Sequence, residues 1–178
     1  SKRAGDFISV REFLNEVDKD SIRFMMLNRS NDVELDFDFD KVLEKTRENP
    51  VFYVQYSYAR ISSLFRTLNI NSNNFIKIDE VNFKLNPHEL NLFRKILDWP
   101  KVIETASVKF EPHRLPFYLY ELATLFHSYW SKGNEDAKYK FIINGKIKSN
   151  NTLLIIKLVA ITIENGMRIL GVSLPVKM

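Results

Sequence analysis

The chain has 178 residues, of which 45% are hydrophobic and 27% charged, so it can bury a core and differs from a disordered tail. The absence of cysteine excludes disulfides, thiolate nucleophiles and thiolate metal sites, and three histidines leave little for a histidine metal centre. The net charge of +4, with a pI near 9.2, is a weak indication of a polyanionic partner.

Charge is distributed unevenly along the chain. Residues 1–45 carry 8 Lys/Arg against 11 Asp/Glu, a net of −3, whereas residues 46–178 carry 18 against 11, a net of +7. This division predicts two units: a small α+β unit over residues 1–45 and a helical bundle over residues 46–178. The fold class expected is therefore mainly α, and the basic unit is the better candidate for contact with nucleic acid.

The first unit shows helix and strand signals in turn. Ser9 and Glu12 have the spacing of a capping box, and a second short helix is expected to begin at Asp20. Residues 33–40 alternate apolar and acidic side chains, which predicts a half-buried strand with one acidic face. This face lacks the glycine turn and closing glutamate of a calcium loop, so a solvated edge is favoured over a metal site.

From residue 41 the apolar period becomes helical. The helices expected are a short one over residues 41–48, one over 50–68, one over 87–98, one restarting at Pro100 with Phe110 on its inner face, and a long one opened by Pro112 and ended by Gly133. A polar connection over residues 134–150 precedes a last helix over residues 151–170, closed by Gly171. That helix is apolar almost all round, so it is expected at the centre of the bundle.

The helix over residues 50–68 has two unlike faces. Its core stripe is expected to consist of Val51, Val54, Tyr58, Ile61, Phe65 and Leu68. Its opposite face consists of Phe52, Tyr53, Tyr56, Arg60, Ser63 and Thr67, where a solvated helix normally carries Glu, Lys and Gln. Such a face suits unpaired bases, which stack on aromatic rings and guanidinium planes. The alternative, favoured from the residues alone, is that another helix of the same domain covers it.

Catalytic and membrane motifs are missing from the sequence. It contains no phosphate-binding glycine loop, no zinc-protease helix motif and no nucleophile elbow. His88, His113 and His127 are each expected to be structural, and no metal site is expected. The most apolar run, residues 153–163, contains Lys157 and is much shorter than the roughly 20 residues that span a bilayer. The residues alone predict a helical binding module with no membrane partner.

Several segments together resemble a known family. They are residues 1–5 (SKRAG), 20–24 (DSIRF), 35–38 (LDFD), 49–60 (NPVFYVQYSYAR), 112–115 (PHRL), 118–123 (YLYELA), 126–127 (FH) and 165–172 (NGMRILGV), followed by Pro175 and Met178. This series resembles the C-terminal third of bacterial arginyl-tRNA synthetases, which are class I aminoacyl-tRNA synthetases, and residues 49–60 are its most specific part. The first residues look like the end of the class I signature loop.

The resemblance implies a stem-contact fold over residues 1–45 and an anticodon-binding bundle over residues 46–178. It implies that Tyr56, Arg60, Tyr129 and Met178 approach the anticodon loop. Lys2 matches a signature-loop lysine that steadies the ATP phosphates during arginine activation, so it would be catalytic only in a full enzyme.

The partner implied is the tRNA for arginine, with no DNA. The chain is expected to be an inactive fragment without cofactor, derived from a monomeric, cytoplasmic arginine–tRNA ligase that uses ATP with Mg. Thr152 departs from the arginine usual at its position, which puts one phosphate or structural contact in doubt. The alternative function is a non-catalytic helical protein-interaction module that kept the fold and lost RNA binding.

Overall fold

The computed structural model describes residues 14–15, 17–30, 32–33, 44, 46–70 and 83–178. Its elements are α2 (Lys19–Leu27), α4 (Pro50–Thr67), α5 (Pro87–Leu97), α6 (Trp99–Val108), α7 (Arg114–Glu135), a 3₁₀ turn (Ala137–Tyr139), β1 (Ile142–Ile143), β2 (Lys146–Ile147) and α8 (Asn150–Leu170). The mainly α class is confirmed. Lys2, the capping box at Ser9 and all but Val33 of the strand expected over residues 33–40 lie outside the described residues, so the two-unit division stays a prediction.

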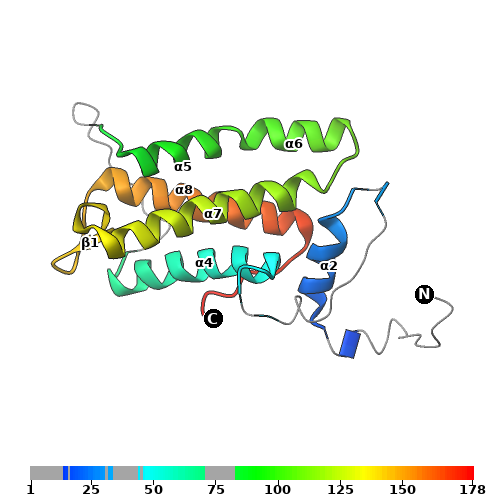
Figure 1. Cartoon of the computed structure of the whole chain (residues 1–178), viewed down its shortest axis with the longest axis horizontal. Coiled ribbons are helices and arrows are strands. Elements are labelled where there is room, and N and C mark those ends of the chain that lie inside the picture. The colour runs from blue at the N-terminus through cyan, green and yellow to red at the C-terminus, as the bar shows by residue number, and fades with distance from the viewer. Residues whose placement is uncertain (1–13, 16, 31, 34–43, 45, 71–82) are drawn as a thin grey trace.

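Helices α7 and α8 form the centre of the bundle. In Figure 1, α5 and α6 run along the top, α7 and α8 lie in the middle, and α4 runs below them. Helix α8 packs against α2, α4, α5 and α7, as its nearly all-round apolar surface predicted, and α7 packs against α4, α5, α6 and α8. Fully buried residues from both central helices meet in one core; they include Leu119, Leu122, Phe126, Ile155, Ile156 and Ile163.

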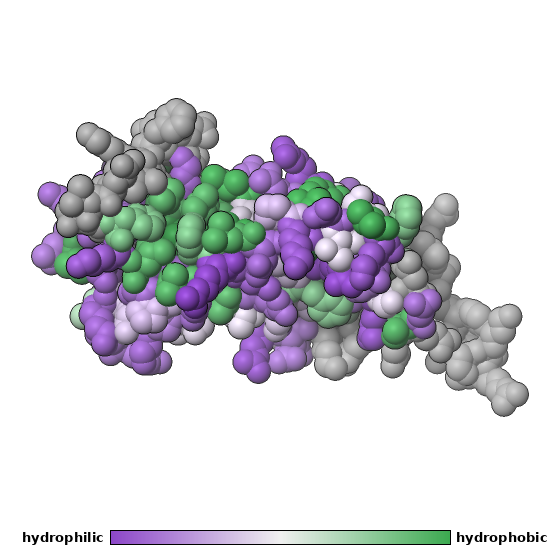
Figure 2. All heavy atoms as spheres, turned by 90° about the horizontal axis from the view of Figure 1, so that it is seen from above, coloured by the Kyte–Doolittle hydropathy of each residue, from purple (hydrophilic) through white to green (hydrophobic). Residues whose placement is uncertain are grey.

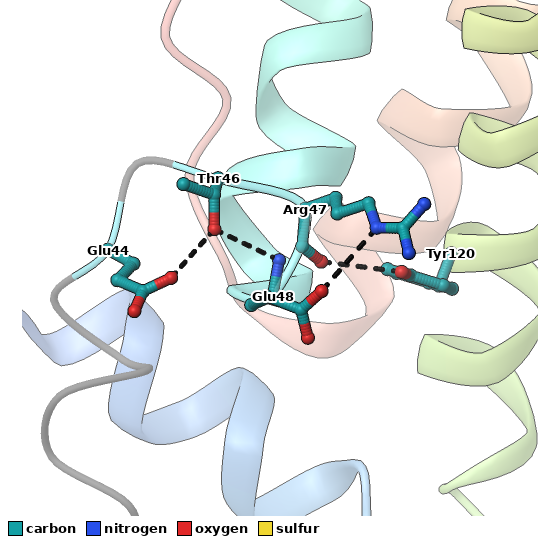
Figure 3. A network of polar contacts seen from close by, with 5 residues as sticks. All are labelled: Glu44, Thr46, Arg47, Glu48 and Tyr120. Carbon is teal, nitrogen blue, oxygen red and sulfur yellow. Dashed lines mark hydrogen bonds and ion pairs between the residues drawn. The ribbon is translucent and has the colours of Figure 1, made fainter.

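A network of hydrogen bonds shapes the turn before α4 (Figure 3). The Thr46 hydroxyl donates to Glu44 and accepts from the Glu48 amide, and the Tyr120 hydroxyl on α7 donates to the Arg47 carbonyl. Residues 46–48 form a bend and a turn, so the short helix predicted over residues 41–48 does not extend over them. Asn49 then caps α4 by accepting from the Phe52 amide, and Pro50 occupies the first helical position as predicted.

Helices α5 and α6 follow one another along one side of the bundle. Asn86 and Glu89 form the capping box that begins α5, in agreement with the sequence. Phe110 was expected on the inner face of the next helix, but this prediction is wrong. Its φ of 54° ends α6, and its side chain is 81% exposed. Figure 2, which looks onto this side, shows apolar surface in several patches separated by polar residues.

The ends of α7 differ from the prediction. The helix begins at Arg114, two residues after Pro112, and it accommodates Pro116 in its first turn, where a missing amide costs no hydrogen bond. Gly133 lies within the last turn and does not end the helix. A Cβ there would lie 3.1 Å from the Tyr139 carbonyl oxygen and 3.3 Å from the Lys140 Cα, so glycine permits the chain after α7 to cross closely.

The connection between α7 and α8 contains a hairpin that the sequence interpretation missed. Strands β1 and β2 pair antiparallel, Ile142 opposite Ile147, and Asn144 and Gly145 have φ values of 51° and 74° in the turn between them. An Asn-Gly pair with both residues at positive φ is typical of a two-residue hairpin. The signal was therefore present in a segment that was read only as polar.

The end of α8 and the segment after it contact helix α2. Gly171 ends α8 with a φ of 68°, as predicted, and a Cβ there would lie 2.8 Å from the Arg23 Nε of α2. The Ser173 amide donates to Asp20. Within the described parts of the chain, no helix is long and apolar enough to cross a membrane, and no group of three His, Asp or Glu side chains could hold a metal ion.

Candidate nucleic-acid interface

Helix α4 presents a row of three large side chains spaced four residues apart. Phe52, Tyr56 and Arg60 lie within 80° of one another around the helix, because four residues complete slightly more than one turn. The rings of Phe52 and Tyr56 stack with centroids 5.7 Å apart and an interplanar angle of 13°. All three side chains are half-buried, so each retains accessible surface.

Helix α7 adds two more rings to this row. The imidazole of His127 lies 5.7 Å from the Tyr56 ring at an interplanar angle of 24°. The Arg60 guanidinium carbon lies 4.4 Å from the centroid of Tyr56 and 5.1 Å from that of Trp130, within the range of cation–π attraction. We call this group, Phe52, Tyr56, Arg60, His127 and Trp130, the α4–α7 face.

The two interpretations left open for the unusual face of α4 each account for part of it. Tyr53 is packed by the neighbouring helix, since its ring lies 4.4 Å from His127 and 5.3 Å from Tyr120. Burial raises the pKa of the Tyr53 hydroxyl, which fits a structural ring. Helix α7 therefore covers one edge, while Phe52, Tyr56 and Arg60 remain partly accessible.

Arg60 is oriented by neutral groups. Its Nη2 donates to the Tyr56 hydroxyl at 3.0 Å, and its Nη1 lies 3.4 Å from His127 Nδ1. Among the described residues, no carboxylate lies within ion-pairing distance of this guanidinium. The cation is held in place without being neutralised, so it can attract a carbonyl oxygen or a phosphate of a ligand.

His127 is 7% exposed and is a neutral part of the face. Burial lowers its pKa to about 4, the charge of Arg60 acts in the same direction, and a hydrogen bond to the Tyr53 carbonyl only partly opposes them. The sequence predicted a structural role for His127, and the contacts of both ring nitrogens agree with that expectation.

Tyr129 was expected beside the anticodon loop, but the structure places it in the core. Its side chain is 0% exposed, and its hydroxyl donates to Glu89 at 2.9 Å and accepts from Asn86 Nδ2 at 2.8 Å. Burial raises the pKa of this hydroxyl. A ring without accessible surface cannot stack on a base, so the expected contact does not fit this position. Trp130, the next residue of α7, reaches the face instead.

Thr152 joins the same buried network. Its hydroxyl donates to Glu89 Oε1 at 2.6 Å, and its side chain is 1% exposed. Thr152 therefore makes a structural contact in this chain. We call Asn86, Glu89, Tyr129 and Thr152 the Glu89 cluster.

Met178 ends the C-terminal segment, which runs alongside α4. Gln55 Nε2 donates to the Ser173 carbonyl at 3.0 Å and Arg66 Nη1 to the Val176 carbonyl at 2.8 Å. Both donors lie roughly a quarter turn around α4 from Tyr56. The segment thus runs beside the α4–α7 face, and Met178 is 53% exposed at its end. Of the expected site residues, the structure brings Tyr56 and Arg60 together and leaves Tyr129 apart.

Two residues of the face were not predicted as binding residues. His127 was expected to be structural, and Trp130 was not named as a candidate. Their spacing of three places them on one side of α7, and His127 lies seven residues after Tyr120, on the same side again. A joint inspection of the two helices for rings that lie at the edge of each core stripe would have found them.

A family model for the DALR anticodon-binding domain matches residues 54–178. The chain belongs to this family. The match begins within α4 and includes every helix after it, so both halves of the α4–α7 face lie in the domain or at its edge. The resemblance to the C-terminal portion of arginyl-tRNA synthetases is also confirmed, because this chain is similar to enzymes of that kind.

The relatives are arginine–tRNA ligases. The chain is 52% identical over 178 residues to that of Pelagibacter ubique and 44% identical to that of Ruegeria pomeroyi, covering 100% and 97% of this chain and 31% of each relative. A Campylobacter jejuni structure described as an arginyl-tRNA synthetase superposes with a TM-score of 0.83 at 28% identity, over 100% of this chain and 37% of that one. The chain therefore spans about a third of the length of these relatives.

Proposed function

We propose that this chain is the tRNA-binding portion of an arginine–tRNA ligase, and that its α4–α7 face reads the anticodon loop of the tRNA for arginine. The observation that carries the proposal is the Arg60 guanidinium, which is held between the rings of Tyr56 and Trp130 without a described carboxylate partner. Unpaired bases stack on aromatic rings and guanidinium planes, and their edges accept hydrogen bonds from arginine.

The domain family supports an anticodon as the target within RNA. Phosphate neutralisation by the basic residues after position 45 supplies affinity that should weaken with salt, while the face supplies the discrimination between anticodon sequences. We include Met178 in the proposal as a further contact, because the segment that carries it runs alongside α4.

The longer protein's activity is also part of the proposal. It would attach arginine to tRNA with ATP and Mg, as a monomer in the cytoplasm. Lys2 is the residue of this chain that would meet the ATP phosphates, and it lies outside the described residues. The described side chains that serve this function bind and position RNA.

The test is a binding titration with two anticodon stem-loop RNAs that differ only in the anticodon, one of them that of an arginine tRNA. Tyr56→Ala and Arg60→Ala should each weaken binding of the arginine stem-loop by about 1–3 kcal/mol. Lys101→Ala on α6 is the matched control, because it removes one exposed positive charge away from the face.

Equal affinity of the wild-type chain for both stem-loops at moderate salt would contradict anticodon reading. A loss for Tyr56→Ala and Arg60→Ala no larger than that for Lys101→Ala would show that the face is structural. No binding of either RNA, together with a defined protein partner, would favour the interaction module.

A further inference from the structure

The Arg60 side chain needs support from neighbouring residues to keep one orientation. It is long and flexible, and holding it in a single rotamer costs conformational entropy that a ligand must otherwise supply on binding. Tyr56 and Trp130 limit the position of the guanidinium by ring contacts, which tolerate rotation within the plane of the group. Directional support requires hydrogen-bond acceptors, and the Tyr56 hydroxyl and His127 Nδ1 supply them.

The position of the proton on His127 follows from its neighbours. Nε2 lies 3.3 Å from the Tyr53 carbonyl oxygen, which can only accept, so Nε2 carries the hydrogen. In a neutral imidazole the other nitrogen then has a lone pair, and Nδ1 faces Arg60 Nη1 at 3.4 Å. The ring is thus anchored to the backbone of α4 on one side and offers an acceptor to the guanidinium on the other.

The ring itself has little freedom to turn away. His127 packs at 4.4 Å on Tyr53, at 5.7 Å on Tyr56 and at 5.6 Å on Phe126 of the core. A protonated ring would direct an N–H at the Arg60 cation, and this like-charge contact opposes the alternative state. Geometry and charge therefore select one tautomer in one orientation.

We propose that His127 is a positioning residue, which holds the Arg60 guanidinium in the orientation that the α4–α7 face uses to read a nucleobase. The inference rests on the proposed function and adds a residue to it. His127 has 7% exposure, so it acts on RNA through Arg60.

Two substitutions separate the two hydrogen bonds of the ring. In His127→Asn the amide oxygen takes the place of Nδ1 and keeps the acceptor for Arg60, whereas in His127→Gln the amide nitrogen takes the place of Nε2 and keeps the anchor to Tyr53. We expect His127→Gln to weaken binding of the arginine stem-loop about three- to tenfold, the range for one unrestrained long side chain. His127→Asn should bind more nearly like the wild type, and Ser128→Ala, an exposed neighbour on α7, should not change binding.

The same substitutions are then made in an Arg60→Ala background. If His127 acts through Arg60, they should cause no further loss there, since the group to be positioned is gone. Equal losses for the Asn and Gln variants, or losses that persist in the Arg60→Ala background, would overturn the proposal and indicate a role in the fold. Binding is measured below the unfolding temperature of every variant.

A spectroscopic readout is independent of how the variants fold. In long-range ¹H–¹⁵N spectra of the wild-type chain near neutral pH, His127 should show a protonated Nε2 and an unprotonated Nδ1. The opposite tautomer or a doubly protonated ring would overturn the proposal. If Arg60→Ala itself binds like Ser128→Ala, the proposed function fails and takes this inference with it; if Arg60→Ala weakens binding and His127→Gln does not, only this inference fails.

Discussion

The α4–α7 face and the Glu89 cluster both depend on helix α7, and their residues are adjacent at Tyr129 and Trp130. In the Glu89 cluster, the Glu89 carboxylate accepts from the backbone amide of Asn86 and from the hydroxyls of Tyr129 and Thr152. Glu89 is 4% exposed. In the α4–α7 face, the charged group is a guanidinium with neutral partners and accessible surface.

The difference lies in where the charge finds its complement. The Glu89 carboxylate sits in the first turn of α5, where the helix dipole and three donors satisfy it from within the protein. Arg60 is oriented by neutral groups of the protein, so its charge remains available to a ligand. We infer that the first cluster contributes to stability and the second to binding, and substitutions in each should separate the two properties.

Glu89→Ala should produce the largest effect. It leaves the Tyr129 and Thr152 hydroxyls and the Asn86 amide without their acceptor, and each buried unsatisfied group costs about 1–3 kcal/mol. We expect the free energy of unfolding to fall by about 3–4 kcal/mol in urea denaturation, after local rearrangement. RNA affinity of the folded fraction should not change, and a parallel loss of intrinsic affinity would contradict the separation.

Acidification should destabilise the chain through His127. Its pKa is about 4 when folded and 6.5 when unfolded, so between these values the unfolded state binds a proton that the folded state lacks. The free energy of unfolding should therefore fall as the pH decreases from 6.5 to 4, by about 2–3 kcal/mol from this group.

The control for this effect is His127→Gln, which removes the titrating group and keeps the anchor to Tyr53. The difference in stability between wild type and variant should diminish as the pH falls, and a difference independent of pH would contradict the assignment. Among the described residues, the ionisable side chains in contact with the ring are Arg60, Tyr53 and Tyr56.

Tyr129→Phe should have an intermediate effect, confined to stability. It removes one buried hydroxyl and leaves Asn86 Nδ2 without that acceptor, so the free energy of unfolding should fall by about 1–2 kcal/mol. Thermal unfolding and RNA titration of the same preparation provide the measurement. A clear loss of RNA affinity without a loss of stability would restore Tyr129 to the binding surface.

Tyr56→Phe is the matched change on the α4–α7 face and should have the smallest effect. It removes the acceptor for Arg60 Nη2 and keeps the ring, so RNA binding should weaken by about 0.5–1.5 kcal/mol, the contribution of one hydrogen bond. Stability should stay within about 0.5 kcal/mol, as for other changes near the surface. A loss of stability in Tyr56→Phe, together with a loss of RNA affinity in Tyr129→Phe, would contradict the roles assigned to the two groups.

Local signals account for the parts of the fold that were predicted. Asn49 and Pro50 begin α4, Asn86 and Glu89 begin α5, and Gly171 ends α8, because caps and proline act within a few residues of chain. The apolar stripe of α4 was also correct at its buried positions, and Tyr56 and Arg60 were placed on the opposite face from periodicity alone.

The errors have both local and long-range origins. Gly133 looked like a helix end, but it lies where the backbone of residues 139–140 closely approaches α7. Phe110 ends α6 in a left-handed conformation that a bulky side chain seldom adopts. Tyr129 and Trp130 differ by one position, or 100° of rotation, and the packing of α7 between its neighbours decides which ring is buried.

Helix α8 has a consequence for synthesis of the protein. It is made after α4, α5 and α7, yet it supplies the apolar partner of all three. Until residues 150–170 have left the ribosome, those earlier helices expose surfaces that are prone to aggregation. A message that stops before residue 150 would encode every side chain of the α4–α7 face without the helix that supports it, so ribosome-bound chains of that length should depend on chaperones.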